Sequence, residues 1–165
     1  MGFLSMLEHS GFGTWVREAP TLWAYPTVLF LHTVGLAFLV GINVAIDLRF
    51  LGVASAMPLA PMEKLFPLMW AGFWVNALSG VALLIADATT KLVNPVFYVK
   101  MAFIALGVVN MAWSKRQLFR EPDELTRHPA SAHAKRVAIA SLVFWVGATT
   151  AGRLMGYLGP VSGLE

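Results

Sequence analysis

Cysteine is absent from this chain of 165 residues. Disulfide bonds, iron–sulfur clusters and thiolate metal sites are therefore excluded. Charged residues are also scarce, at 13% of the chain, against roughly 25% in soluble domains. The net charge of +3 comes without a long basic run. No basic patch of the kind that binds nucleic acid is therefore expected.

Hydrophobic residues are abundant instead, at 58% of the chain. They gather in four runs that are long enough to cross a bilayer, which takes a helix of about 20 residues. These runs predict spans at about 26–51, 65–87, 95–113 and 137–157, with a polar loop at 114–136. The shorter, mildly amphipathic start predicts a helix lying on the membrane surface. The predicted fold is a single all-α membrane domain, a four-transmembrane-helix bundle with a short N-terminal interfacial helix.

The distribution of Lys and Arg predicts the orientation of these spans. The loop 114–136 is rich in both residues, and Arg49 and Lys64 flank the connection on the same side. The opposite side holds Arg17 and Lys91. Because cytoplasmic loops carry the excess of Lys and Arg, both termini are predicted outside the cytoplasm of a bacterial inner membrane. No cleaved leader is expected, because the first residues lack a basic stretch.

Three ionisable residues fall at a similar predicted depth on three different spans. At 1.5 Å per residue, His32 lies about 10 Å below the outer edge of its span, and Lys100 and Arg153 lie about 7 Å below theirs. Asp87, at the outer edge of the second span, can supply only one anion to these two cations. Ionisable groups inside a membrane span are costly, so each one is a candidate for function.

A heme b would satisfy this arrangement, because heme needs an axial ligand and carries two carboxylates. In this hypothesis His32 ligates the metal, Gly35 lets the flat macrocycle approach its helix, and Trp74 and Trp145 wall it. Lys100 and Arg153 then bind the propionates. A lone core histidine bonded to a backbone carbonyl or to Thr149 is the alternative interpretation of His32, and snorkelling to the headgroups is the alternative for the two cations.

A second polar group lies at the predicted cytoplasmic end of the first span. Asp47 and Arg49 are interpreted as an interfacial charge pair that also signals orientation. The alternative is a site for a proton or a quinone headgroup, formed with Asn43 and Asn110. Two further histidines, His128 and His133, belong to the polar loop and are interpreted as solvated.

Three segments carry a resemblance to known proteins: LHTVGLAFLVGINVAIDLRFLG (31–52), NPVFYVKMAFIALGVVNMAW (94–113) and AGRLMGYLGP (151–160). The chain resembles small four-helix bacterial inner-membrane proteins of unknown function, and more distantly the HemJ-type protoporphyrinogen oxidases and the CopD-type copper-resistance membrane proteins. In the HemJ-type family an early histidine binds heme b and a later lysine is needed for activity, and His32 and Lys100 match these positions. The proline–arginine element of that family and a histidine near Asn110 are missing here.

Several functions follow as hypotheses. The first is a b-type heme protein that transfers electrons within the membrane, with quinone, a redox protein or a second copy of the chain as partner beside the lipid bilayer. The second is an enzyme that oxidises a porphyrinogen, as the resemblance implies. A structural subunit of a larger membrane complex is the third. Copper transport is the weakest, because clusters of methionine and histidine facing outward are missing.

Overall fold

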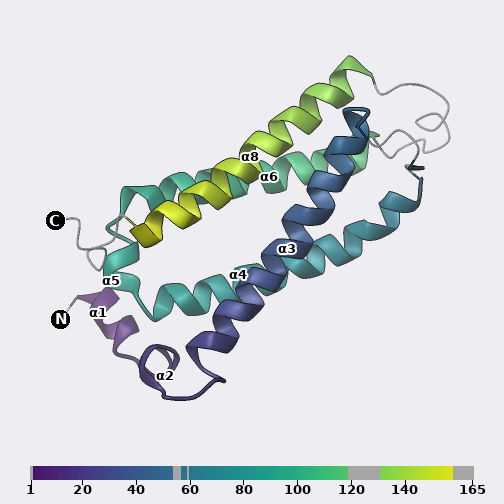
Figure 1. Cartoon of the computed structure of the whole chain (residues 1–165). Coiled ribbons are helices and arrows are strands. Elements are labelled where there is room, and N and C mark those ends of the chain that lie inside the picture. Colours follow the sequence, from purple (N-terminus) through teal and green to yellow (C-terminus); the bar gives the residue numbers. More distant parts are fainter. Residues whose placement is uncertain (1, 54–56, 59, 119–130, 158–165) are drawn as a thin grey trace.

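A computed structural model describes residues 2–53, 57–58, 60–118 and 131–157 of the chain (Figure 1). Its elements are α1 (Phe3–Glu8), α2 (Gly11–Glu18), α3 (Tyr25–Phe50), a 3₁₀ helix η1 (Ala60–Leu65), α4 (Phe66–Ile85), α5 (Ala88–Lys91), α6 (Pro95–Leu118) and α8 (Ala132–Tyr157). Helices α3, α4, α6 and α8 contain the four stretches that are long and apolar enough to cross a membrane. The described ranges contain no strand. The protein is therefore a multi-pass four-helix membrane bundle.

Prolines stand in the first turn of three of these helices, at Pro26, Pro67 and Pro95. The first N–H groups of a helix have no intrahelical acceptor, so proline loses nothing at these places. Helices α6 and α8 are each about one turn longer, at the loop that joins them, than the predicted spans. The extra turns carry basic residues, among them Lys115, Arg116, Lys135 and Arg136.

The end of α3 is set by a glycine. Gly52 has φ +88°, in the left-handed region that favours glycine. Its N–H donates to the carbonyl of Arg49, and the N–H of Val53 donates to the carbonyl of Leu48. This pair of bonds is the Schellman arrangement, which satisfies the last carbonyls of a helix.

The four long helices form two hairpins, α3–α4 and α6–α8, which are joined through packing of α3 on α8. Helices α3 and α4 cross where Gly35 meets Gly72 (Figure 1). A Cβ on Gly35 would lie 2.6 Å from the backbone nitrogen of Asn76 and 2.8 Å from the carbonyl oxygen of Gly72. Small residues allow this backbone contact between membrane helices. Helix α4 has no comparable packing with α6 or α8 within the described residues.

The apolar core is concentrated at one end of the bundle. We call this the η1 end, where α3 ends and η1 and α4 begin, and we call the opposite end, with α1, α2 and α5, the α5 end. The core side chains lie mainly in the half towards the η1 end, and they are Leu39, Ile46, Phe50, Met62, Phe66, Met69, Met111, Ala134, Val137, Ala138 and Trp145. In Figure 1 the C-terminal end of α3 meets α6 and α8 near the η1 end, whereas the start of α3 lies apart from α8 towards the α5 end.

The N-terminal segment forms two short helices rather than one. Ser10 separates them, and its hydroxyl accepts a hydrogen bond from the N–H of Gly13, which caps α2. Their exposed side chains include four large apolar ones, as expected for helices that lie on a membrane surface, and these are Phe3, Met6, Phe12 and Trp15.

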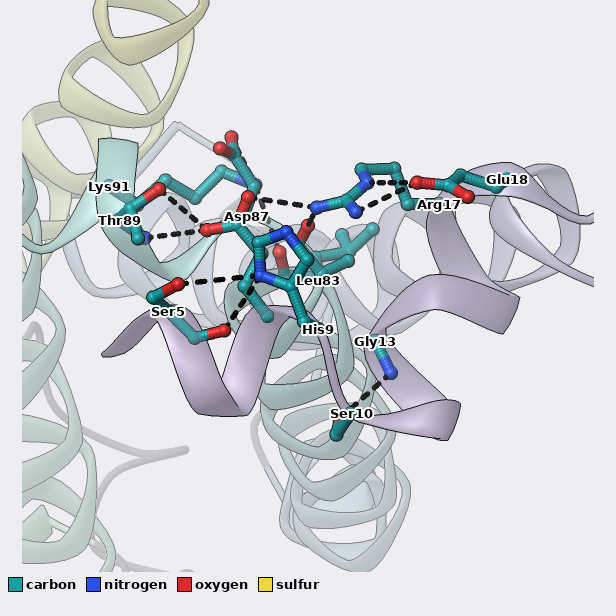
Figure 2. A network of polar contacts seen from close by, with 12 residues as sticks. Ser5, His9, Ser10, Gly13, Arg17, Glu18, Leu83, Asp87, Thr89 and Lys91 are labelled. Atoms are coloured by element: carbon teal, nitrogen blue, oxygen red, sulfur yellow. Dashed lines mark hydrogen bonds and ion pairs between the residues drawn. The ribbon is translucent and has the colours of Figure 1, made fainter. Parts of the chain in front are cut away.

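A polar network ties these two helices to the ends of α4 and α5 (Figure 2). Thr89 donates to the carboxylate of Glu8 from its hydroxyl at 2.6 Å and from its backbone N–H at 3.1 Å. These bonds lower the pKa of Glu8. Arg17 pairs with Glu8 and Glu18 at 2.8 Å each and donates to the carbonyl of Ala86. The bond to Glu18 raises the pKa of Arg17.

Candidate functional site

His32 lies on α3 against one face of α4, in the half of the bundle towards the α5 end. Its Nδ1 is 2.9 Å from the backbone carbonyl of Asn76 and 3.2 Å from the hydroxyl of Ser79. The ring lies over Gly80, where a Cβ would be 3.1 Å from Cε1 of the imidazole. The amide of Asn76 donates back to the carbonyl of His32 at 2.8 Å. Helix α4 therefore fixes the position of the ring on two sides.

These contacts determine the tautomer of His32. A carbonyl oxygen can only accept, so the 2.9 Å contact requires a proton on Nδ1. The hydroxyl of Ser79 donates to carbonyls of its own helix, at Val75 and Asn76, and so accepts from the ring. The amide nitrogen of Asn76 is 3.3 Å from Nδ1, a longer contact that these bonds outweigh. The lone pair is then on Nε2, which has no hydrogen-bond partner among the described residues.

This arrangement is the one that metal-bound histidines usually show. Such a histidine donates its other ring N–H to a carbonyl or carboxylate, which fixes the ring and leaves the second nitrogen for the metal. The same bond also fits the alternative of a core histidine held by a backbone carbonyl. Thr149, proposed as a partner in that alternative, bonds the carbonyls of Trp145 and Val146 on its own helix instead.

Lys100 on α6 reaches towards the same region. Its side chain is half-buried and lies over Gly152 of α8, with Nζ 3.8 Å from the place of a Cβ there. The ammonium is near enough to His32 to act on the imidazole electrostatically. Lys100 forms no ion pair or side-chain hydrogen bond with any residue that the structure describes. A lysine and a histidine from different hairpins thus share one region of the bundle.

The other predicted site residues are arranged differently. Arg153 is exposed on α8 and makes no ion pair with a described residue. Asp87, expected to supply one anion to these cations, lies 3.5 Å from the ammonium of Lys91 instead. That expectation is wrong, because Lys91 lies one helical turn after Asp87 and forms the ion pair with its carboxylate.

Gly35 serves the contact between α3 and α4, so the backbone of α4 occupies the face expected to admit a macrocycle. Trp74 is 58% exposed and packs edge-on against Phe73. Trp145 is 1% exposed and lies over Gly107 of α6, where a Cβ would be 3.1 Å from its indole. These two tryptophans do not form a common wall beside His32. The glycine next to the imidazole is Gly80.

Asn76, Ser79 and Gly80 are the site residues that the sequence reasoning did not assign. A signal for them exists in the sequence. Their spacing of three and four places them on one face of α4, and counting back from Asp87 puts Ser79 about 12 Å below the end of the span, close to the depth predicted for His32.

The second predicted polar group, at the η1 end, contains a correction. Asp47 and Arg49 are not a charge pair. Asp47 is buried, whereas Arg49 donates to the carbonyl of Met57. Residues two apart on a helix point in different directions, which explains the separation. Asn110 donates to the carbonyl of Val137 at 3.3 Å and so takes part in packing of α6 on α8.

Of the two loop histidines, His128 lies outside the described residues. His133 is exposed, with its ring edge-on to Trp113 at 5.0 Å. Among the described residues there is no group of three or more His, Asp or Glu side chains that could hold a metal ion. Comparisons of the chain with models of protein families, with curated proteins and with solved structures found no match.

Proposed function

We propose that this protein binds heme b in the membrane through Nε2 of His32 and transfers electrons. The observation that supports this most is the hydrogen bond of the His32 Nδ1–H to the carbonyl of Asn76. It leaves on Nε2 the lone pair that an iron needs, on a ring whose orientation α4 already fixes. A bound heme would supply one-electron redox chemistry within the bilayer.

The cations of this region support the same proposal. Lys100 is a half-buried ammonium in a membrane protein, and no carboxylate of a described residue pairs with it. Such a group is expensive in hydrocarbon unless an anion accompanies it. Propionates of a heme near His32 would provide that anion, with Arg153 as a second and more exposed partner. Trp74 has no part in this site. The glycine beside the imidazole of His32 is Gly80, whereas Gly35 contacts the backbone of α4.

The surroundings of the protein follow from its composition. A multi-pass bundle with its excess of basic residues in the loop 114–136 fits a bacterial cytoplasmic membrane, with both termini on the outer side. Electron transfer there needs a donor and an acceptor. We propose quinone or an attached redox protein for these roles.

Absorption spectroscopy tests this proposal. The protein is expressed with heme supply, purified in detergent, and measured oxidised and reduced with dithionite. We expect a Soret band that His32→Ala abolishes. His9→Ala is the matched control, because His9 is exposed just after α1 and its ring bonds Ser5 of that helix, so the band should stay. A colourless wild type would refute the proposal and favour the structural subunit.

A second candidate function, porphyrinogen oxidation, is favoured by the nearness of Lys100 to His32. This is the pair of residues that the HemJ-type resemblance implies. Complementation of a strain that lacks protoporphyrinogen oxidase separates the two candidates. Growth that depends on both His32 and Lys100 would favour the enzyme, whereas a heme spectrum without complementation would favour electron transfer alone.

A further inference from the structure

A buried polar cluster lies between the two hairpins, in the half towards the η1 end. It consists of Asn43 and Asp47, one turn apart on α3, and Ser141 on α8, and we call it the Asp47 cluster. The three residues are between 1% and 4% exposed. The amide of Asn43 donates to the hydroxyl of Ser141 at 3.2 Å, and that hydroxyl is a hydrogen-bond partner of the Asp47 carboxyl. The cluster thus links α3 to α8 by polar contacts.

One oxygen of this carboxyl, Oδ2 of Asp47, is inaccessible and has no hydrogen-bond partner in the described part of the chain. Nor does a cation pair with Asp47 there. None of the described charged and titratable groups of the surrounding elements forms an ion pair or hydrogen bond with Asp47, and these groups are Arg49, Glu63, Lys64, Lys115, Arg116, His133, Lys135 and Arg136. Of these, Arg49 bonds the carbonyl of Met57, and Lys115 lies over the ring of Phe66.

A negative charge at this place would be uncompensated. Burying an ion without a partner is far more costly than burying the neutral acid. The hydroxyl of Ser141 can donate to one oxygen of a neutral carboxyl while it accepts from Asn43. A proton on the other oxygen removes the charge without any further protein group.

We propose that Asp47 is a proton-binding site within the membrane, and that its carboxyl holds its proton at neutral pH. The site joins the two hairpins, because the packing of α3 on α8 connects them. Release of the proton therefore requires α3 and α8 to part enough for water or a cation to reach Oδ2. By linkage, whatever separates these helices also favours release of the proton. The site does not depend on heme and stands apart from the proposed function.

Infrared spectroscopy of the whole protein in lipid nanodiscs tests this directly, through the C=O stretch that only a protonated carboxyl shows. The chain contains three aspartates, at positions 47, 87 and 123, so labelling with ¹³C-aspartate identifies the band. We expect one isotope-shifted band at pH 7 that is lost in Asp47→Asn and kept in Asp87→Asn. Asp87 is a suitable control because it pairs with Lys91 at the membrane edge.

Three results would overturn the proposal: no isotope-shifted band at pH 7, a band that survives in Asp47→Asn, or a band that disappears when sodium chloride is added. The last result would mean that Asp47 binds a metal cation instead. If Asp47→Asn does not fold, Ser141→Ala provides the test. Loss of the hydroxyl should move the band to higher frequency, because a C=O that accepts fewer hydrogen bonds vibrates faster. An unmoved band would contradict the assignment.

Discussion

The two ends of the bundle differ in the burial and the bonding of their polar side chains. At the η1 end, Asn43, Asp47 and Ser141 lie inside an apolar core, and the amide of Asn43 bonds the hydroxyl of Ser141 across two helices, although Oδ2 of Asp47 has no partner in the described structure. Towards the α5 end, His32 and Lys100 are only half-buried, and Lys100 has no carboxylate beside it in the described structure. At the η1 end a polar contact joins two helices, whereas towards the α5 end an imidazole nitrogen and an ammonium have no hydrogen-bond or ion-pair partner among the described residues.

This difference indicates where stability and function reside. A packed core with bonded polar groups contributes stability, and a region with unpaired polar groups costs stability. Proteins keep such costly arrangements mainly where a ligand is bound. The comparison predicts that substitutions towards the η1 end change unfolding most, and that substitutions towards the α5 end change ligand binding most.

The largest effect is expected from Trp145→Ala. The indole is almost fully buried against Gly107, and removing a core tryptophan typically costs about 3–5 kcal/mol. Unfolding in mixed detergent micelles, followed by circular dichroism, measures the loss. Trp74→Ala is the control, because that side chain faces outward. Equal losses in both variants would remove the distinction between a packed interior and a lipid-facing surface.

Gly35→Leu should come next, at about 1–3 kcal/mol, since extra atoms at a close backbone contact force the helices apart. A Cβ at Gly35 would already be 2.6 Å from the backbone of α4. Gly41→Leu on the same helix meets nothing within 4 Å and should leave the unfolding midpoint nearly unchanged. A similar midpoint for Gly35→Leu would show that α3 and α4 do not cross there.

Lys100→Met should have opposite effects on stability and on binding. Without heme, removal of a half-buried charge that has no ion-pair partner among the described residues should stabilise the protein by about 0.5–2 kcal/mol. With heme, the same variant should hold less of it, measured as the ratio of Soret to protein absorbance. Lys91→Met is the contrast, because it loses the ion pair with Asp87 and the bond to the carbonyl of Leu83. If heme-free Lys100→Met were less stable than the wild type, the charge of Lys100 would not be costly as proposed.

The smallest effect concerns the attachment of α1 and its dependence on pH. Hydrogen bonds from Thr89 lower the pKa of Glu8 from its ordinary value of 4.5. The unfolded segment therefore binds the proton more readily than the folded one. The stabilisation of the attached α1 is complete above pH 4.5, and it is lost as the pH falls through the lowered pKa of Glu8. Amide hydrogen exchange in α1, corrected for its intrinsic pH dependence, should rise in acid. Glu8→Gln should exchange faster already at pH 6, and a pH-independent α1 would exclude this role.

Much of this architecture could be predicted from the sequence. Apolar runs of sufficient length gave the membrane helices, and Pro67 and Pro95 indicated where two of them begin. Position 52 carried a further signal, because a glycine just beyond an apolar run favours the left-handed residue that ends a helix. The similar depth of His32 and Lys100 followed from the constant rise of a helix.

The faces of the helices could not be predicted. Membrane helices are apolar on all sides, so periodicity does not reveal which side meets protein and which meets lipid. Gly35 therefore looked equally suited to a ligand or to a backbone, and Trp74 looked like a wall although it faces outward. Partners within one turn, such as Lys91 for Asp87, were overlooked in favour of more distant ones.

The contact of Gly35 with Gly72 has a mechanical consequence. A tilt of α3 on α4 that kept this close contact in place would move the two ends of α3 by different amounts. His32 is three residues from Gly35, about 4.5 Å along the axis, whereas Asp47 is twelve residues away, about 18 Å along it. A tilt of α3 would therefore swing the aspartate through an arc about four times as long as that of the histidine. Movement of the Asp47 end of α3 would leave the imidazole of His32 almost in place on Asn76.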